Sequence, residues 1–119
     1  MRYVDGYVLP VRRRQLATYL RVARKAGRIW RQHGALEYRE CVGDDLKVQW
    51  GALFPRMVRA KTGETVVFAW IVFKSRAHRD RVNAKVMQDP RMATMMDKDS
   101  MPFDMKRMVY GGFKVLVDA

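Results

Sequence analysis

The sequence predicts one α+β domain whose strands and helices follow each other in the order β-α-β-β-α-β. Four short segments are alternately apolar and polar, or continuously apolar, which is typical of strands. Two longer segments carry apolar residues three and four positions apart, which is typical of amphipathic helices. The length of 119 residues and the hydrophobic fraction of 49% suit a single folded domain over residues 1–119.

In the first half of the chain we expect a strand over residues 2–9, a helix over 12–33 and a strand over 35–42. Pro10 is expected to stop the first strand, and Gly34 is well placed to end the helix. The apolar stripe of this helix consists of Leu16, Tyr19, Leu20, Ala23, Gly27 and Trp30. We expect this stripe to face the sheet while the intervening arginines face solvent.

The second half contains the two remaining strands. Residues 43–61 show no regular pattern and are expected to form a partly ordered excursion. Residues 65–73 form an expected strand with apolar residues on both faces, a pattern of strands buried on both sides. The last strand is expected over residues 107–117, weakened where Gly111 and Gly112 follow each other.

A second helix is expected between these two strands, with Ser75 as its N-cap. Its inward stripe consists of His78 or Arg79, followed by Val82 and Val86. Asp89 and Pro90 are typical of a new N-cap and first helical position, so a short methionine-rich helix is expected from there to about Asp97.

This element order predicts a ferredoxin-like antiparallel sheet with both helices on one face. On the first strand Tyr3, Asp5 and Tyr7 share one face, and we expect the helices to cover the opposite face. The uncovered face would then expose tyrosines and part of the third strand, which is costly for a monomer. A second copy packed sheet against sheet removes this exposure, so we expect a homodimer that forms an α/β barrel.

The charge of the chain is strongly positive, with 24 Lys and Arg residues against 12 Asp and Glu residues and a formal net charge of +12. Such a field favours anionic partners without defining a site. Arginines along the first helix, at Arg21, Arg24, Arg28 and Arg31, offer phosphate contacts for weak, non-specific, salt-dependent RNA binding. The simpler interpretation is a solvated helix face that keeps the protein soluble.

Several classes of protein are not expected from this sequence. Cys41 is the lone cysteine, which excludes an internal disulfide and a cysteine-built zinc site, and no metal site is expected. No run approaches the roughly 18 apolar residues that a membrane span needs. The first residues do not resemble a signal peptide. We therefore expect a cytoplasmic protein that does not contact a membrane.

Five segments of the chain resemble a bacterial family catalogued as domain of unknown function 1428. They are residues 3–6, 34–38, 74–87, 101–104 and 106–113, so the resemblance extends over nearly the whole chain. It implies the dimeric α/β-barrel fold. The family has no established activity, cofactor or site residue that the resemblance could assign to this chain.

Asp5, Trp70 and His78 form the candidate catalytic set, because they lie on neighbouring elements of the predicted topology. The set is similar to that of haem-degrading monooxygenases of this superfold, which combine an asparagine, a tryptophan and a histidine. Cofactor-free oxygenases of the same superfold are a related precedent, and the cofactor of this chain stays open. Convergence requires Asp5 and Trp70 to share one face of the sheet. Core packing for Trp70 and His78, and a salt bridge for Asp5, are the simpler interpretations.

A mostly apolar pocket with a few polar groups is expected around these residues. Its candidate ligand-binding residues are Tyr3, Tyr7, Arg79, Asn83 and Arg107. Either arginine is suited to balance the charge of Asp5. The leading functional hypothesis is small-molecule binding or cofactor-independent oxygenase-like chemistry in this pocket. The alternative is a non-catalytic module that binds an anionic partner, including RNA through the first helix.

Overall fold

The computed structural model describes residues 1–95 and 101–119. Its strands are β1 (Tyr3–Arg12), β2 (Glu37–Val42), β3 (Glu64–Phe73) and β4 (Val109–Lys114). Its helices are α1 (Leu16–Gln32), α2 (Phe54–Met57), α3 (Arg76–Gln88) and α4 (Pro90–Met95), with 3₁₀ turns η1 (Arg13–Gln15) and η2 (Met105–Arg107). The predicted order of strands and main helices is confirmed.

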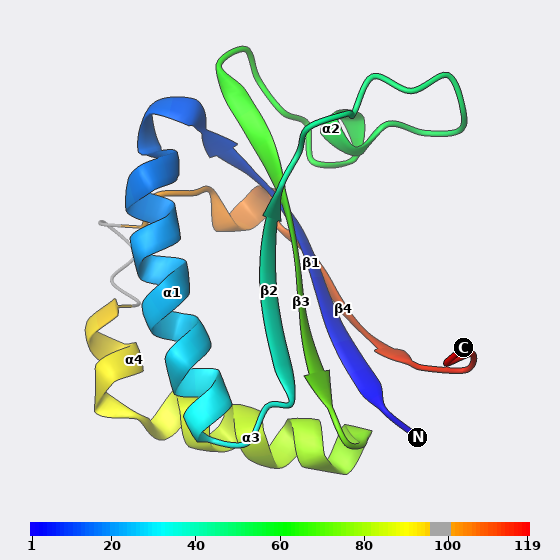
Figure 1. Cartoon of the computed structure of the whole chain (residues 1–119). Helices are drawn as coiled ribbons and strands as arrows, with labels where there is room; N and C mark the ends of the chain where they lie inside the picture. Colours follow the sequence, from blue (N-terminus) through cyan, green and yellow to red (C-terminus); the bar gives the residue numbers. More distant parts are fainter. Residues whose placement is uncertain (96–100) are drawn as a thin grey trace.

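The four strands form one antiparallel sheet in the order β2-β3-β1-β4, which is the ferredoxin-like arrangement. Helices α1, α3 and α4 lie on one side of this sheet, and α2 lies beyond the other (Figure 1). The predicted α+β class with an antiparallel sheet is therefore confirmed. The dimeric barrel is a property of two chains and stays a prediction.

Pro10 does not stop the first strand, contrary to expectation. Strand β1 continues through Pro10 to Arg12 and stays paired with β3 over its whole length. Strand β4 pairs with β1 only as far as Val8, so β1 is an edge strand beyond that residue. The missing N–H group of Pro10 therefore removes no hydrogen bond on that side, which is where a sheet tolerates proline.

The helices also cover the opposite face of the sheet from the one that was predicted. Tyr3 and Asp5 are buried beneath the helices, and Asp5 contacts α3. The opposite face, on which Val4 and Gly6 lie, is the one left open. Alternation alone specifies which residues share a face, but it does not specify which face is covered.

Helix α1 packs closely on strand β2 because Gly27 faces Tyr38. A Cβ atom on Gly27 would lie 2.8 Å from the ring of Tyr38, so only glycine leaves room for this approach. The predicted inward stripe is largely confirmed, since Tyr19, Ala23, Gly27 and Trp30 are all buried. Gly34 has a φ of 118° and ends the turn that follows the helix, as predicted.

Helices α3 and α4 begin at the predicted caps. The hydroxyl of Ser75 accepts a hydrogen bond from the backbone N–H of His78 at 3.1 Å. Asp89 accepts a hydrogen bond from the backbone N–H of Arg91 at 2.9 Å, at the start of α4. The expected end of this helix near Asp97 lies outside the described residues. None of the helices in the described part of the chain is long and apolar enough to cross a membrane.

The open face of the sheet carries a broad apolar surface. Its exposed members include Phe68 on β3 together with Val109 and Phe113 on β4, and Phe113 is 63% exposed. The excursion that contains α2 covers only one end, where Val58 packs against Val8 and Val66. Most of this face is therefore open to water in the single chain.

Candidate functional site

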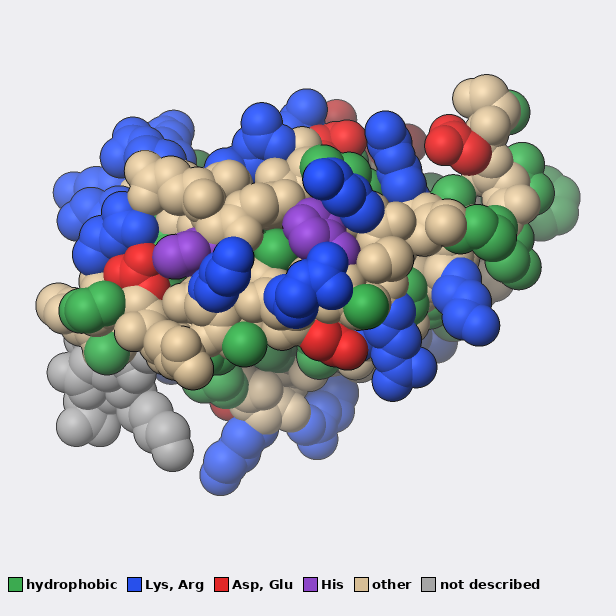
Figure 2. All heavy atoms as spheres, turned by 90° about the horizontal axis from the view of Figure 1, so that it is seen from below, with side chains coloured by type: hydrophobic (Ala, Val, Ile, Leu, Met, Phe, Trp, Pro, Cys, Tyr) green, Lys and Arg blue, Asp and Glu red, His purple; other side chains and the backbone are tan. Residues whose placement is uncertain are grey.

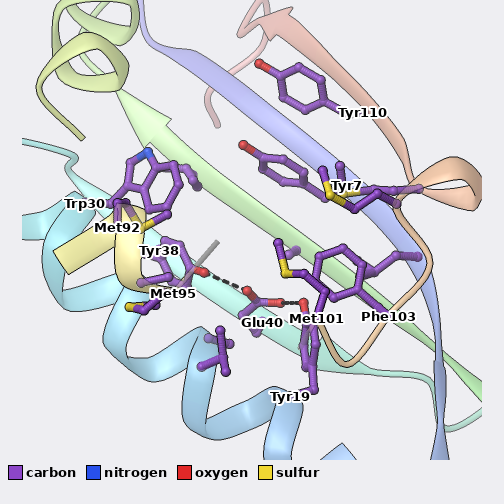
Figure 3. A pocket seen from close by; sticks show the side chains of 18 of the residues that line it. Tyr7, Tyr19, Trp30, Tyr38, Glu40, Met92, Met95, Met101, Phe103 and Tyr110 are labelled. Atoms are coloured by element: carbon purple, nitrogen blue, oxygen red, sulfur yellow. Dashed lines mark hydrogen bonds between the residues drawn. The ribbon is translucent and has the colours of Figure 1, made fainter. Parts of the chain in front are cut away.

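A cavity of about 330 Å³ lies between the helices and the covered face of the sheet (Figure 3). The sheet forms its floor, helices α1, α3 and α4 form one wall, and the segment that precedes β4 forms another. Aromatic lining residues are Tyr7, Tyr19, Trp30, Tyr38, Phe103 and Tyr110. Methionine lining residues are Met87, Met92, Met95, Met101, Met105 and Met108.

Few charged or polar side chains line this cavity. Among the described lining residues, Glu40 carries the one carboxylate, Asn83 adds an amide, and there is no lysine, arginine or histidine. A small number of polar groups in an apolar wall is the usual composition of a small-molecule site. The described lining therefore suits a compound that is mostly hydrocarbon.

Glu40 on β2 accepts hydrogen bonds from two tyrosines, Tyr19 on α1 and Tyr38 on β2 itself. Its Oε1 accepts a hydrogen bond from the Tyr19 hydroxyl at 2.6 Å, and its Oε2 accepts one from the Tyr38 hydroxyl at 2.7 Å. Burial raises the pKa of both tyrosines, and the negative charge of Glu40 raises it further. Both hydroxyls therefore stay protonated and act as donors to the carboxylate (Figure 3).

Asp5 lies next to the cavity and is fully buried. Its Oδ1 accepts a hydrogen bond from Nη1 of Arg79 at 2.7 Å, and its Oδ2 lies 3.4 Å from both the Asn83 amide and the Tyr110 hydroxyl. Burial raises the pKa of Asp5, while the charge of Arg79 and the three hydrogen bonds oppose that rise. The prediction that an arginine balances Asp5 is confirmed, and that arginine is Arg79.

Asn83 joins the Asp5 cluster to the cavity. Its Oδ1 accepts a hydrogen bond from the indole N–H of Trp30 at 3.0 Å, while its amide group donates to Asp5. Tyr7 stacks on Tyr110 with ring centroids 4.8 Å apart. Of the five predicted ligand-binding residues, Tyr7 and Asn83 line the cavity.

The other three predicted ligand-binding residues lie elsewhere. Tyr3 is buried in the core, and the Arg79 guanidinium lies over its ring at 4.9 Å. Arg107 forms a bidentate salt bridge with Glu64, with both N···O distances 2.7 Å, and also contacts Asp104. Its bonds with Arg107 lower the pKa of Glu64 to about 2. Arg107 thereby anchors the segment that forms one wall of the cavity.

The predicted convergence of Asp5, Trp70 and His78 is wrong. Gly6 is the register partner of Trp70, whereas Asp5 is paired with Ile71, so Asp5 and Trp70 lie on opposite faces of the sheet. Trp70 is half-buried on the open face, where its indole N–H donates to Glu37 at 3.2 Å.

His78 has a local structural role at the start of α3. Its Nδ1 accepts a hydrogen bond from the backbone N–H of Lys74 at 3.0 Å, and its ring lies edge-on to Phe73. Burial lowers its pKa, and three neighbouring cationic side chains lower it further, so the ring stays neutral. In the described residues, no three His, Cys, Asp or Glu side chains are placed to hold a metal ion.

Sequence reasoning missed Glu40 as a site residue. Its position was visible, because it lies between Tyr38 and Val42 on the apolar side of an alternating strand. An acidic residue at such a position is costly to bury without partners. An acidic residue on the apolar side of a strand was also the reason for choosing Asp5, and the same argument applies to Glu40.

The fold and cavity define a class of small α+β proteins with a pocket between helices and sheet. Residues 2–105 match the family described as "Protein of unknown function (DUF1428)", and the chain belongs to this family. The chain is 42% identical to the uncharacterized protein YbaA of Escherichia coli K12 over 118 residues, covering 99% of each chain. The corresponding protein of Shigella flexneri is equally similar.

Two solved structures share the fold. A NIPSNAP family protein of unknown function from Agrobacterium tumefaciens aligns with a TM-score of 0.63 at 15% identity, over 96% of this chain and 87% of its own. An uncharacterized NIPSNAP domain protein from Burkholderia xenovorans aligns with a TM-score of 0.59 at 15% identity, over 98% and 94% of the two chains. At this identity the likeness concerns the fold alone.

Proposed function

We propose that this protein is a homodimer in which each subunit binds a small, mostly apolar molecule in the cavity between its helices and its sheet. The observation that carries the proposal is the cavity of about 330 Å³ with aromatic and methionine walls. Its volume lies at the lower end of the range of roughly 300–1,000 Å³ that is typical of ligand pockets. Methionine side chains adapt to the shape of a ligand, which suits such a wall.

The geometry supports binding better than oxygenase-like chemistry. The three residues that suggested such chemistry do not share a pocket, because Trp70 lies on the opposite face of the sheet from Asp5. The carboxylate of Asp5 is occupied by Arg79 and lacks exposure to the solvent. Binding requires only the space, the apolar walls and the few polar groups described above.

The open face of the sheet supports the homodimer. Phe68, Val109 and Phe113 expose apolar area that a second copy would cover in a sheet-to-sheet contact. A stable interface of this kind buries on the order of 1,600 Å² in total. Both cavities would lie on the outer sides of the two sheets, so that dimerisation leaves them accessible.

Filling the cavity is expected to abolish the binding of an apolar reporter. N-phenyl-1-naphthylamine is uncharged at neutral pH and fluoresces in apolar surroundings, so it is a suitable probe. Ala26 lines the cavity, and Ala26→Leu places additional carbon atoms in that space. We expect the reporter affinity to fall about tenfold or more, because part of the buried contact area is lost.

The matched control is Ala17→Leu, which adds the same atoms on the exposed side of α1. This variant is expected to bind the reporter as the unchanged protein does. Equal binding by all three proteins, or failure of the unchanged protein to bind, would count against the pocket. Circular dichroism of each variant verifies that the fold is intact.

A groove between α1 and β2 supports a second candidate function, which is the binding of an anionic partner. It is lined by Arg24 and Arg28 on α1, by Arg31 near the end of that helix, and by Arg39 on β2. In the described residues Arg24 and Arg28 form no ion pair. Basic side chains are also spread over the face that contains α3, with few acidic ones among them (Figure 2). The arginines of the groove suit weak phosphate contact without base recognition.

RNA binding through this groove is expected to depend steeply on salt. For single strands the slope of log K against log salt changes by about 0.7 for each phosphate contact. Arg24→Gln with Arg28→Gln is therefore expected to flatten the slope by about 1.4, measured by fluorescence anisotropy. Arg76→Gln with Arg81→Gln on α3 is the control and should have a smaller effect. Affinity that survives physiological salt, or that discriminates between sequences, would contradict this expectation.

A further inference from the structure

We propose that the cavity is built for a small protonated organic amine, whose ammonium group lies beside Glu40 and whose hydrocarbon part contacts the aromatic and methionine walls. This inference rests on the proposed function, because it names the class of ligand that the same cavity binds.

Glu40 is the one carboxylate among the described residues that line the cavity, and it retains capacity to accept hydrogen bonds. An ionised carboxylate has about four acceptor sites. The hydroxyls of Tyr19 and Tyr38 each use one, on different oxygens. At least one further donor can therefore bind without displacing either tyrosine, and the two tyrosines hold the carboxylate in a defined orientation.

The strongly buried carboxylates of the described chain have cationic partners. Asp5 pairs with Arg79 at 2.7 Å, Glu64 with Arg107 at 2.7 Å, and Asp89 with Arg91 at 2.7 Å. Within the described residues Glu40 forms no ion pair, although it is partly buried against apolar walls. A buried carboxylate gains most from a charged donor. Arginines line the groove on the α1 side of Glu40, but in the described chain none forms an ion pair with it, so this role is left to the ligand.

The walls suit the remainder of such a ligand. Aromatic faces attract cations, and sets of aromatic rings are the common way in which proteins bind organic ammonium groups. Tyr19, Trp30 and Tyr38 bring ring systems to the same cavity as the carboxylate (Figure 3). A ligand with a carboxylate would instead place its negative charge near Glu40. A neutral alcohol would gain a hydrogen bond but no charge neutralisation.

The positive net charge of the protein opposes the approach of a cation. Arg24 and Arg28 are exposed to water, in the groove between α1 and β2 that Glu40 also lines. At physiological ionic strength, exposed charges are screened over about 8 Å. The interaction with Glu40 takes place inside an apolar cavity, where screening is weaker. Binding is therefore tested at 0.15 M salt and pH 7, at which aliphatic amines are protonated.

The test compares three compounds that share a phenyl ring and differ in their head group. They are 2-phenylethylamine, 2-phenylethanol and phenylacetate, each used to displace N-phenyl-1-naphthylamine from the unchanged protein and from Glu40→Gln. We expect the amine to compete about tenfold or more better than the alcohol, with phenylacetate the weakest. In Glu40→Gln this advantage of the amine is expected to disappear, while the alcohol changes by no more than about twofold.

The possible failures are distinguishable. If the reporter binds but the amine competes no better than the alcohol, or the advantage persists in Glu40→Gln, the amine inference is wrong and the pocket stands. If phenylacetate competes best, the inference is overturned in favour of an anionic ligand. If the reporter does not bind to the unchanged protein, both the pocket and the inference fall. Tyr38→Phe, which keeps the ring and removes one donor, should weaken the amine preference and retain reporter binding.

Discussion

Replacing Arg79 with methionine is expected to destabilise the protein by about 3–5 kcal/mol at pH 7. The carboxylate of Asp5 has no exposure to solvent and would lose the cation that lies 2.7 Å from it. The remaining groups, Asn83 and Tyr110, lie at 3.4 Å and carry no positive charge. The free energy of unfolding is measured by urea denaturation of both proteins at the same concentration.

The loss is expected to shrink as the pH is lowered from 7 toward 4. Burial already raises the pKa of Asp5 above its ordinary value of 3.8, and Arg79 opposes that rise. A raised pKa means that the folded state holds the proton more tightly than the unfolded chain does. Asp5 therefore makes its full contribution to stability below pH 3.8, and this contribution is lost as the pH rises through the folded-state pKa of Asp5. Without Arg79 this pKa is higher still.

A double variant separates the destabilisation caused by the unpaired buried charge from that caused by lost packing. Arg79→Met combined with Asp5→Asn has no charge at this position, so it is expected to recover a large part of the stability at pH 7. It should also lose the pH dependence that the single variant shows. A single variant that loses less than about 1 kcal/mol, or whose loss does not vary with pH, would show that the pair contributes little.

Replacing Phe113 with glutamate is expected to dissociate the proposed homodimer. In a single chain the ring is 63% exposed and lies over Gly6 and Gly111, so the change should cost the isolated subunit little. In a sheet-to-sheet dimer it would bury two unpaired charges, one from each copy. Each costs about 2 kcal/mol or more, so the dissociation constant should rise on the order of 1,000-fold.

The adjacent residue on the same strand offers a matched control. Lys114 is the register partner of Tyr3 and lies on the other side of the sheet from Phe113, so Lys114→Glu should leave the dimer intact. Light scattering at micromolar concentration gives the oligomeric state of each protein. A stable monomer of the unchanged protein, or a dimer that survives Phe113→Glu, would exclude this face as the interface.

Much of the fold could be predicted because local patterns determine local structure. Helix spacing identified the inward stripe of α1, and Ser75 was recognised as the cap of α3 from its place before the helix. The end of β1 was misjudged, because Pro10 breaks a strand only where its N–H group is needed. That depends on where β4 begins, which is a property of the whole sheet.

The candidate site was predicted less completely, for a reason that concerns register. Alternation placed Asp5 correctly relative to its neighbours on β1, and the choice of Arg79 as a partner was available from the sequence. The face of Trp70 depends on its pairing with β1, and a slip of one residue moves every side chain to the other face. Both faces of β3 are rich in apolar residues, so composition could not decide between the two registers.

The central position of β1 has a consequence for how the protein forms during synthesis. Tyr3 pairs with Phe73 on one side and with Lys114 on the other. The pairing of β1 is therefore complete only after β4 has been synthesised. Contacts between residues so far apart in the chain slow folding. While β4 is still inside the ribosome, β1 and the apolar strand β3 have no complete sheet to join. A nascent chain with such exposed strands is prone to aggregate, and it is the kind of substrate that chaperones protect.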